Sequence, residues 1–336
     1  MLHTFNKSVR HLWRRFGRKP MAEKVDMTGR HVIVTGASPN SLGYETARVL
    51  AGWGASVVAT STRHVARMES ALKEDLHRMG ANEDNVTARP LDLCDVDSVN
   101  RFTTWYRNSR NGKLHVLVNN AGIHKNILKP HTRPPLSKDG FEIHWRINYL
   151  GTCHLTSLLL PLLKQGGLES GDARLVNVSS HLHDRVTNAD LFGGNRRYHS
   201  WDAYGLSKLA LVHHAYEIER RFAKQYNLLS MALHPGSVDT NLTRMEAPQG
   251  KIGKVLHRIS SALASLVLLP LKDGAQTIVM CASKTPLQGG RYYDRCAIAE
   301  STDASKDETV SKLLWDKSEA WVAGLVTTDG VEHEQV

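Results

Sequence analysis

Residues 31–45 read HVIVTGASPNSLGYE, and this stretch decides the fold class of the chain. It passes from a short β-branched strand pattern, through a turn that carries Gly36, into a helical pattern that begins at Leu42. A strand, a glycine turn and a helix start form an anion site, because backbone N–H groups and the helix dipole face a phosphate there. Glycine turns are common, but this one lies at the first strand–helix junction, where dinucleotide-binding folds place their phosphate site.

The alternation of short strands and longer helices continues to about residue 233. Strands are predicted at 31–35, 55–60, 86–91, 114–118, 174–179 and 229–233, and helices at 42–53, 64–79, 96–109, 140–164 and 202–224. Nearly continuous apolar strands are typical of a parallel sheet covered by helices on both faces. No repeat or linker interrupts the pattern, so we expect one α/β domain with a Rossmann-type doubly wound parallel sheet. Residues 241–271 break the alternation, and we expect them to lie over an edge of the sheet.

Composition excludes several classes of protein. Of the 336 residues, 41% are hydrophobic and 23% are charged, which is ordinary for a globular protein. No apolar run reaches the roughly 18 residues of a spanning helix, which excludes a polytopic membrane protein. The spacing of the cysteines supports neither a disulfide framework nor a zinc site, and favours thiols in a reducing, intracellular compartment. The pair His181 and His183 lacks the frame of a metal motif, so we expect no metal and place both histidines in a loop.

The net charge of +10 is concentrated at the N-terminus. Residues 1–20 hold six Lys or Arg and no acid, and their apolar residues recur at helical spacing. We assign residues 1–28 to a basic amphipathic segment, suited either to peripheral contact with an anionic membrane or to mitochondrial targeting. A disordered basic tail in a cytoplasmic protein is the alternative. The rest of the chain shows no basic residues interleaved with aromatics, so no nucleic-acid partner is indicated.

The end of the second predicted strand bears on the choice of dinucleotide. An NAD site carries an acidic residue there for the ribose hydroxyls, but the sequence reads Thr60-Ser61-Thr62-Arg63. Hydroxyl groups followed by Arg63 suit a 2′-phosphate, which favours NADP(H) over NAD(H). The alternative interpretation is that Arg63 is a solvated residue at the start of a helix.

Tyr204 and Lys208 lie four residues apart, which places them on one face of a helix. Tyrosine has an ordinary pKa of about 10, and a neighbouring ammonium group lowers it toward the range useful for acid–base catalysis. The spacing alone more often marks a surface pair. Here further motifs follow predicted strands, where ligands bind in open α/β sheets. They are Asn119–Gly122 (NNAG), Val176–Ser180 (VNVSS) and 234–240 (HPGSVDT), with Asn148 in the long helix between the first two.

Taken together, these motifs resemble the short-chain dehydrogenase/reductase superfamily. Within it, the chain is similar to the retinol dehydrogenase group, which includes protochlorophyllide reductase, WW-domain oxidoreductase and polyprenol dehydrogenase-like proteins. The resemblance spans about residues 29–325 and includes the late segments DGAQT, GRYY and LWDKS, at 273–277, 290–293 and 314–318. It implies a catalytic domain at 29–326, with a substrate lid at about 241–271, and a polar tail at 327–336.

The resemblance also implies roles for individual residues. Tyr204 would be the proton donor and acceptor, and Lys208 would lower its pKa and hold the nicotinamide ribose. Ser180 would bind the substrate oxygen, and Asn148 would hold a water in a proton relay. The other residues expected to contact the cofactor are Thr35, Gly36, Ser38, Asn40, Ser41, Leu42, Gly43, Arg63, Asp92, Leu93, Asn120, Ala121, Gly122, Pro235, Gly236, Ser237, Val238 and Thr240.

Two stretches depart from the family pattern. The glycine motif TGxxxGxG is one residue longer here, and Asn40-Ser41 occupies the place of its middle glycine. We expect a Cβ there to crowd the pyrophosphate, with Ser38, Asn40 and Ser41 compensating through side-chain hydrogen bonds. Residues 181–201 are longer than in the simplest members, and we expect them to form a loop beside the substrate.

The sequence therefore predicts an NADP(H)-dependent enzyme that interconverts an alcohol and a carbonyl compound. Many residues of 256–271 are apolar, where the family has its lid, which favours a lipophilic substrate: a retinoid, a polyprenol, a steroid or a long-chain aldehyde. The alternative is a catalytically weak NADP(H)-binding regulatory or scaffold protein of the same fold. A hydrolase is not supported, since the sequence has no GxSxG motif. A homo-oligomer is left open.

Overall fold

A computed structural model of the chain describes residues 20–109, 112–127, 130–131, 133–192, 197–236 and 270–328. Several expectations fall outside these residues: most of the N-terminal basic segment, the lid up to residue 269, the end of the polar tail, and the predicted cofactor contacts Ser237, Val238 and Thr240.

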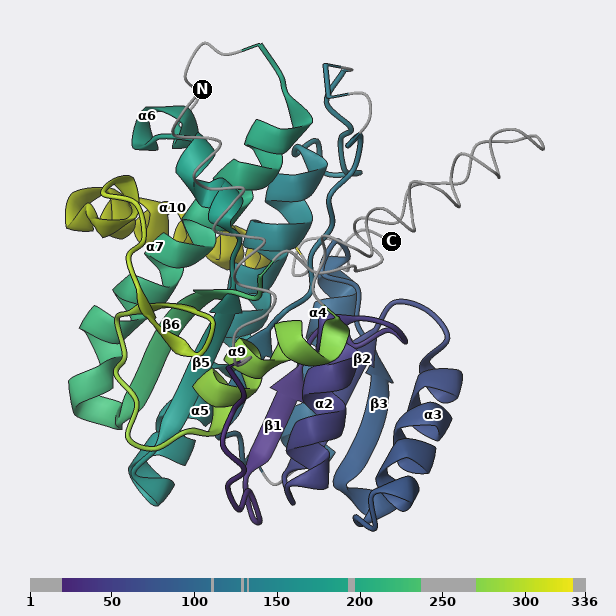
Figure 1. Cartoon of the computed structure of the whole chain (residues 1–336). Coiled ribbons are helices and arrows are strands. Elements are labelled where there is room, and N and C mark those ends of the chain that lie inside the picture. Colours follow the sequence, from purple (N-terminus) through teal and green to yellow (C-terminus); the bar gives the residue numbers. More distant parts are fainter. Residues whose placement is uncertain are drawn as a thin grey trace.

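The described part of the chain contains one eight-stranded sheet in the order β3-β2-β1-β4-β5-β6-β7-β8 (Figure 1). All neighbouring strands are parallel except β7 and β8. The order reverses between β1 and β4, which is the topological switch point of a doubly wound sheet. The predicted fold class is thus confirmed. The strands are β1 His31–Val34, β2 Ser56–Ser61, β3 Val86–Pro90, β4 Val116–Asn119, β5 Ala173–Val178, β6 Leu228–His234, β7 Tyr292–Asp294 and β8 Ala297–Ala299.

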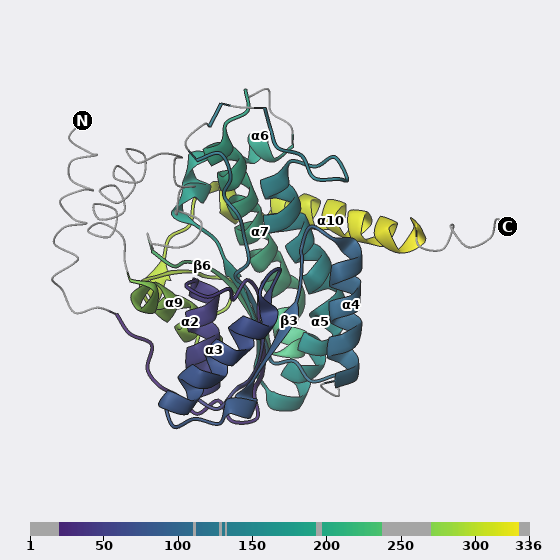
Figure 2. The same ribbon diagram turned by 90° about the vertical axis from the view of Figure 1, so that its right-hand side faces the viewer.

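Helices cover both faces of the sheet (Figures 1 and 2). Alternation along β1 explains the two cores: Val32 and Val34 pack with the layer of α2, α3 and α9, whereas Ile33 packs with the layer of α4, α5 and α7. The long helices are α2 Leu42–Gly52, α3 Val65–Arg78, α4 Val96–Ser109, α5 Gly151–Ser170, α7 Ser200–Tyr226, α9 Leu271–Ser283 and α10 Glu308–Thr328. None of the described helices is long and apolar enough to cross a bilayer.

The structure corrects two of the predicted elements. The helix expected at 140–164 begins with a single π-helical stretch, η2 (Trp145–Leu150), and continues as α5 to Ser170, where Gly171 ends it at φ +74°. The loop expected at 181–201 contains two short helices, η3 (His181–Arg185) and α6 (Asn188–Leu191), and α7 already begins at Ser200. Two further short 3₁₀ turns are η1 (Glu83–Asn85) and η4 (Ala304–Lys306).

Candidate active site

The loop between β1 and α2 is closely packed against the end of β4. Gly36 has φ +68°, and a Cβ at this position would lie 2.7 Å from Cα of Ala121. A Cβ at Gly43 would lie 2.6 Å from the carbonyl oxygen of Gly36. Both positions therefore require glycine, because other atoms of the protein already fill the space that a side chain would need. Asn40 adopts φ +59°, a left-handed conformation that asparagine tolerates better than most residues, so the turn forms without its middle glycine.

The serine hydroxyls of this loop are engaged within the protein. Ser41 caps α2: its Oγ accepts a hydrogen bond from the backbone N–H of Tyr44 (3.1 Å) and donates one to the carbonyl oxygen of Gly36 (3.1 Å). Ser38 shares a hydrogen bond with Ser61 at the end of β2 (2.8 Å). In this structure the Ser41 proton is bound to Gly36, and the expected donation from Ser41 to a phosphate stays a prediction.

Thr35 and Asn120 join the two strands at the switch point. Asn120 donates from Nδ2 to the carbonyl oxygens of Thr35 (2.8 Å) and Gly36 (3.2 Å). Thr35 Oγ1 accepts from the backbone N–H groups of Asn120 and Ala121, both at 3.0 Å. The Asn120 side chain thus fixes the backbone at the start of the glycine loop.

The ends of β2 and β3 adjoin this loop. Ser61 Oγ donates to the carbonyl oxygen of Arg63 (3.0 Å), and the Arg63 side chain extends into solvent. After β3, Asp92 Oδ1 accepts from the backbone N–H of Cys94 (2.8 Å), while Leu93 is buried and its carbonyl oxygen binds the guanidinium of Arg146 (2.7 Å). Among the described residues, no carboxylate forms an ion pair with Arg63.

Tyr204 lies on α7 with its side chain almost fully buried. Burial raises the pKa of Tyr204 to about 12, and a hydrogen bond with Ser180 opposes part of this rise. The expected lowering of the tyrosine pKa is therefore wrong for the protein without cofactor. The free-energy cost of removing the phenolate from water exceeds the stabilisation that neighbouring groups give it.

Lys208 lies one helical turn further along α7 and is also buried. Its Nζ donates to the carbonyl oxygen of Val178 (2.9 Å) and lies 5.5 Å from the centre of the Tyr204 ring. Burial lowers the pKa of Lys208 to about 8. A Cβ at Gly122 would lie 3.3 Å from this Nζ, so the backbone of Gly122 closely approaches the ammonium group.

Asn148 lies in the π-helical stretch and is completely buried. Its Oδ1 accepts from the backbone N–H of Ile123 (2.8 Å), and its Nδ2 donates to the carbonyl oxygen of Ile123 (3.0 Å) and to Oγ of Ser207 (3.0 Å). Both Nδ2 protons are used in this way. The expected role of Asn148 in holding a water stays a prediction.

The two serines after β5 have different environments. Ser179 Oγ donates to the carbonyl oxygen of Lys208 (2.9 Å) and is buried. Ser180 Oγ accepts from the backbone N–H of Leu182 (3.2 Å) as the cap of η3, which leaves its proton for Tyr204 or a substrate. The structure thus brings together Ser180, Tyr204, Lys208 and Asn148 at the carboxyl ends of β4 and β5.

The predicted cofactor contacts Pro235 and Gly236 follow β6. Both are half-buried, and Gly236 has φ +87°.

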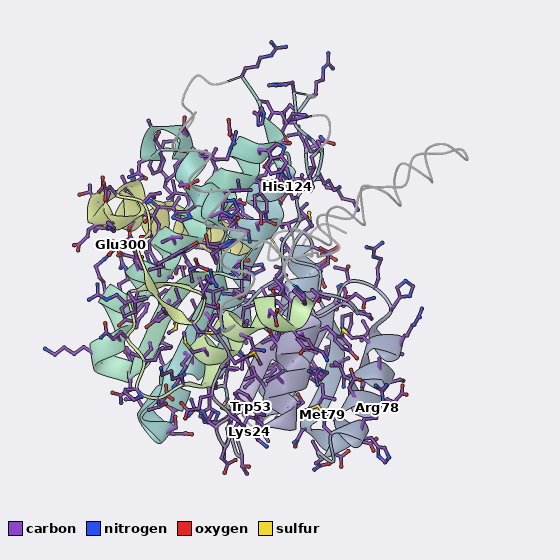
Figure 3. The ribbon with its side chains drawn as sticks, viewed as in Figure 1. Lys24, Trp53, Arg78, Met79, His124 and Glu300 are labelled. Atoms are coloured by element: carbon purple, nitrogen blue, oxygen red, sulfur yellow. The ribbon has the colours of Figure 1, made fainter. Side chains whose placement is uncertain are left out.

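Two histidines of this region differ from the sequence interpretation. His183, predicted to lie in a loop, lies instead in the 3₁₀ helix η3 and is buried. Its Nδ1 binds the carbonyl oxygen of Ser180 (2.6 Å) and its Nε2 accepts from the backbone N–H of Thr302 (3.3 Å). His124, which is labelled in Figure 3, was not among the predicted site residues. It stacks on Tyr204 with ring centres 4.4 Å apart and an interplanar angle of 14°. Its position two residues after the NNAG motif is the one signal that pointed to it.

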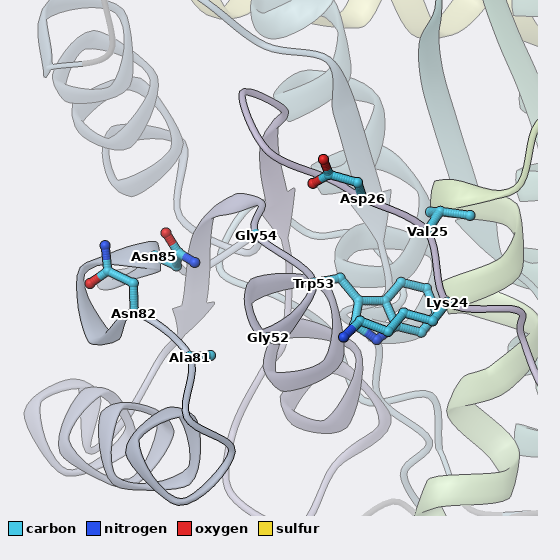
Figure 4. Close-up of a pocket in the computed structure, with 9 residues that line it drawn as sticks. All are labelled: Lys24, Val25, Asp26, Gly52, Trp53, Gly54, Ala81, Asn82 and Asn85. Carbon is cyan, nitrogen blue, oxygen red and sulfur yellow. The ribbon is translucent and has the colours of Figure 1, made fainter.

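A hollow of about 550 Å³ lies elsewhere, among Gly52–Gly54, Ala81 and the residues before β1 (Figure 4). Trp53 and Lys24 lie together on its wall, and Asn82 and Asn85 line its other side. Gly54 precedes β2, so the hollow lies at the amino ends of the strands. Ligands of open α/β sheets bind at the carboxyl ends, where the four candidate catalytic residues are.

A doubly wound sheet with a glycine loop after β1, and with Ser180, Tyr204 and Lys208 at the carboxyl ends of the neighbouring strands, is typical of an oxidoreductase that works with a nicotinamide dinucleotide. Comparison with known proteins agrees: the profile of the short chain dehydrogenase family matches residues 30–250, and the chain belongs to this family. Within the family, it lies in the retinol dehydrogenase-like group.

Individual relatives cover most of the chain. Retinol dehydrogenase 12 of Mus musculus is 35% identical over 298 residues, 88% of this chain and 86% of the relative. Polyprenol dehydrogenase of Mus musculus is 36% identical over 293 residues, 85% of this chain and 82% of the relative. Among solved structures, an uncharacterised protein from Mycobacterium paratuberculosis superposes with a TM-score of 0.64 at 30% identity, covering 90% of this chain and 96% of that one.

Proposed function

We propose that this protein is an NADP(H)-dependent enzyme that reversibly converts a lipophilic alcohol to its carbonyl compound, with Tyr204 as the proton donor and acceptor. The observation that carries the proposal is the buried convergence of Tyr204 with Ser180 and Lys208. Carbonyl reduction requires a proton donor, a second hydrogen-bond donor for the reacting oxygen and a nearby cation. Tyr204, Ser180 and Lys208 supply these three groups at one place.

The residues of the switch point fit a dinucleotide. Gly36 and Gly43 let the loop before α2 pack closely against Ala121 and Asn120. The backbone N–H groups at the helix N-terminus that follows suit a pyrophosphate. Lys208 and Gly122 lie further along, on the side of Tyr204, where a nicotinamide ribose would be held. When bound there, the nicotinamide supplies or accepts the hydride, and the protein has to supply orientation and a proton.

The chain's own residues account for the proton. In the direction of reduction, the Tyr204 hydroxyl gives its proton to the carbonyl oxygen while the Ser180 hydroxyl donates a hydrogen bond to that oxygen. The raised pKa of Tyr204 keeps the phenol protonated at neutral pH, as donation needs. In the direction of oxidation the alcohol proton returns to the phenolate, and the ammonium group of Lys208 stabilises that anion.

A preference for NADP(H) rests on Arg63. Arg63 is exposed just beyond β2, and its backbone binds Oγ of Ser61, which shares a hydrogen bond with Ser38. A guanidinium and hydroxyl groups are suitable donors for a 2′-phosphate, and no acid stands at the end of β2 to accept from an unmodified ribose.

A lipophilic substrate is supported by the apolar residues of 256–271 and by relatives named for retinol and polyprenol. The basic, amphipathic pattern of residues 1–20 further supports peripheral contact with a membrane from which such a substrate could be taken. Pelleting with anionic vesicles tests that contact. The full chain should bind more strongly than a variant lacking residues 1–20, and equal binding would contradict the membrane proposal.

The central experiment is a screen for NADPH oxidation over retinal, steroid ketones and long-chain aldehydes, with Tyr204→Phe in parallel. We expect turnover of at least one class by the wild type and its loss in Tyr204→Phe, while the affinity for NADPH, measured by fluorescence quenching, stays nearly unchanged. Undiminished turnover in Tyr204→Phe would contradict the assignment of the acid–base residue. NADPH binding without turnover of any carbonyl would favour the regulatory alternative.

A further inference from the structure

His124 contacts the candidate catalytic tyrosine more closely than any other described aromatic side chain does. Its ring is stacked on Tyr204, with centres 4.4 Å apart and planes only 14° apart. The edge of Trp201 packs against it at 4.7 Å, and His144 meets it edge-on at 5.6 Å. The Nε2 atom of His124 is buried and has no hydrogen-bond partner among the described residues.

The segment that carries His124 is held at several points. Asn148 binds both the N–H and the carbonyl oxygen of Ile123, the residue before His124. On the other side, the backbone N–H of Lys125 donates to Nε2 of His144 (2.8 Å). Further along, Trp201 Nε1 donates to the carbonyl oxygen of Ile127 (3.1 Å). Hydrogen bonds thus fix the backbone on both sides of His124, which limits how far its imidazole can move from the Tyr204 ring.

We propose that His124 is a positioning residue for Tyr204: its ring holds the phenol in the plane from which the hydroxyl reaches Ser180 and the substrate oxygen. A stack this close covers one face of the phenol, so it restricts rotation of the tyrosine and excludes water from that face. The proposal rests on the function proposed above, because it presupposes that Tyr204 transfers the proton.

The stacked imidazole is uncharged at neutral pH. Burial lowers the pKa of His124 to about 4, and the charges of His144 and Lys208 act in the same direction. A neutral ring covers the phenol without supplying a cation, so it helps to keep the tyrosine protonated until substrate arrives. In the part of the chain that the structure describes, the ionisable or polar side chains that face Tyr204 are His124, His144, Lys208 and Ser180.

The test compares His124→Ala, which removes the stack, with His124→Phe, which keeps an aromatic ring, in the full chain saturated with NADPH. We expect His124→Ala to lower kcat of carbonyl reduction about 3- to 10-fold, the range of one aromatic pair, with the Kd for NADPH unchanged. Reduction requires protonated Tyr204, so kcat falls as pH rises through the tyrosine pKa. Admitting water eases ionisation, so this fall should occur at lower pH in His124→Ala. Lys208 also titrates in every variant, with a pKa of about 8 in the wild type, so the comparison uses the separate fall of kcat at the higher pKa of Tyr204.

His124→Phe should keep the wild-type kcat and pH profile, and His77→Ala, at an exposed histidine of α3, serves as a control that should equal the wild type. If His124→Ala is too unstable to purify, His124→Leu replaces it. This variant removes the ring stack but still excludes water, so we expect the loss of kcat and no shift of the pH profile. Equal kcat and pH profile in His124→Ala and wild type would overturn the proposal, and so would a loss in His124→Phe as large as in His124→Ala. Activity that survives Tyr204→Phe would instead overturn the function proposed above.

Discussion

Asn148 holds the backbone of Ile123 on both sides, with its Oδ1 bound to the N–H (2.8 Å) and its Nδ2 bound to the carbonyl oxygen (3.0 Å). A side-chain amide here completes a pairing that resembles one rung of a β-ladder. Through it, the π-helical stretch η2 determines where the segment after β4 passes Tyr204, the candidate catalytic tyrosine.

The first prediction concerns this pairing. Asn148→Leu keeps the branched shape of the side chain but leaves the N–H and the carbonyl oxygen of Ile123 without their partner. A lost set of buried hydrogen bonds of this kind costs about 2–4 kcal/mol of unfolding free energy. We expect a lower melting temperature and loss of most activity. Asn100→Leu, at a partly exposed asparagine of α4, is the control for a change of residue type. Equal melting temperatures for Asn148→Leu and the wild type would contradict the prediction.

The second prediction separates the serines that follow β5. Ser180→Ala removes the hydroxyl that faces Tyr204, and we expect kcat to fall about 100-fold, as when one stabilising donor is lost from an oxyanion site. Ser179→Ala removes a hydrogen bond to the carbonyl oxygen of Lys208, so it should lower the melting temperature more than kcat. Steady-state kinetics and thermal unfolding of both variants check this, and equal kcat values in the two would refute it.

The third prediction concerns the dinucleotide. Arg63→Glu should raise KM for NADPH at least 10-fold, because it places a carboxylate where we propose that the 2′-phosphate binds, and should change KM for NADH much less. Arg67→Glu makes the same change of charge one helical turn along, also at an exposed position, and should leave the ratio of the two KM values near that of the wild type. An equal shift in both variants would indicate a general effect of charge.

The fourth prediction follows from the burial of Lys208. Its pKa is about 8 in the folded chain and near 10.5 when unfolded, so the unfolded chain binds more protons between these values. Stability contributed by this group therefore rises with pH, by about 2 kcal/mol from pH 7 to pH 9.5. Lys208→Met lacks the titration, and subtracting its unfolding free energy from that of the wild type at each pH isolates the effect. A difference that stays constant over this range would contradict the prediction.

Much of the fold follows from local patterns. Apolar runs such as Val32–Val34 and the glycine turn after them predict strands, helices and their alternation, because period and turn chemistry are properties of neighbouring residues. The end of the sheet shows the limit. β7 and β8 have three residues each, too short for a periodic signal, and they form only because β6 offers an edge on which Tyr292–Asp294 can pair.

The sequence by itself determined the doubly wound class and the candidate residues Ser180, Tyr204 and Lys208, since strand-end motifs in a parallel sheet meet at one edge. Only the tertiary structure decided their electrostatics. Burial raises the pKa of Tyr204, although its spacing from Lys208 had predicted the opposite. Tertiary contacts likewise stack His124 on the Tyr204 ring and bring His183 into a hydrogen bond with the carbonyl oxygen of Ser180. The reason is physical: desolvation and ring stacking depend on what surrounds a side chain from distant parts of the chain, which spacing along the sequence does not encode.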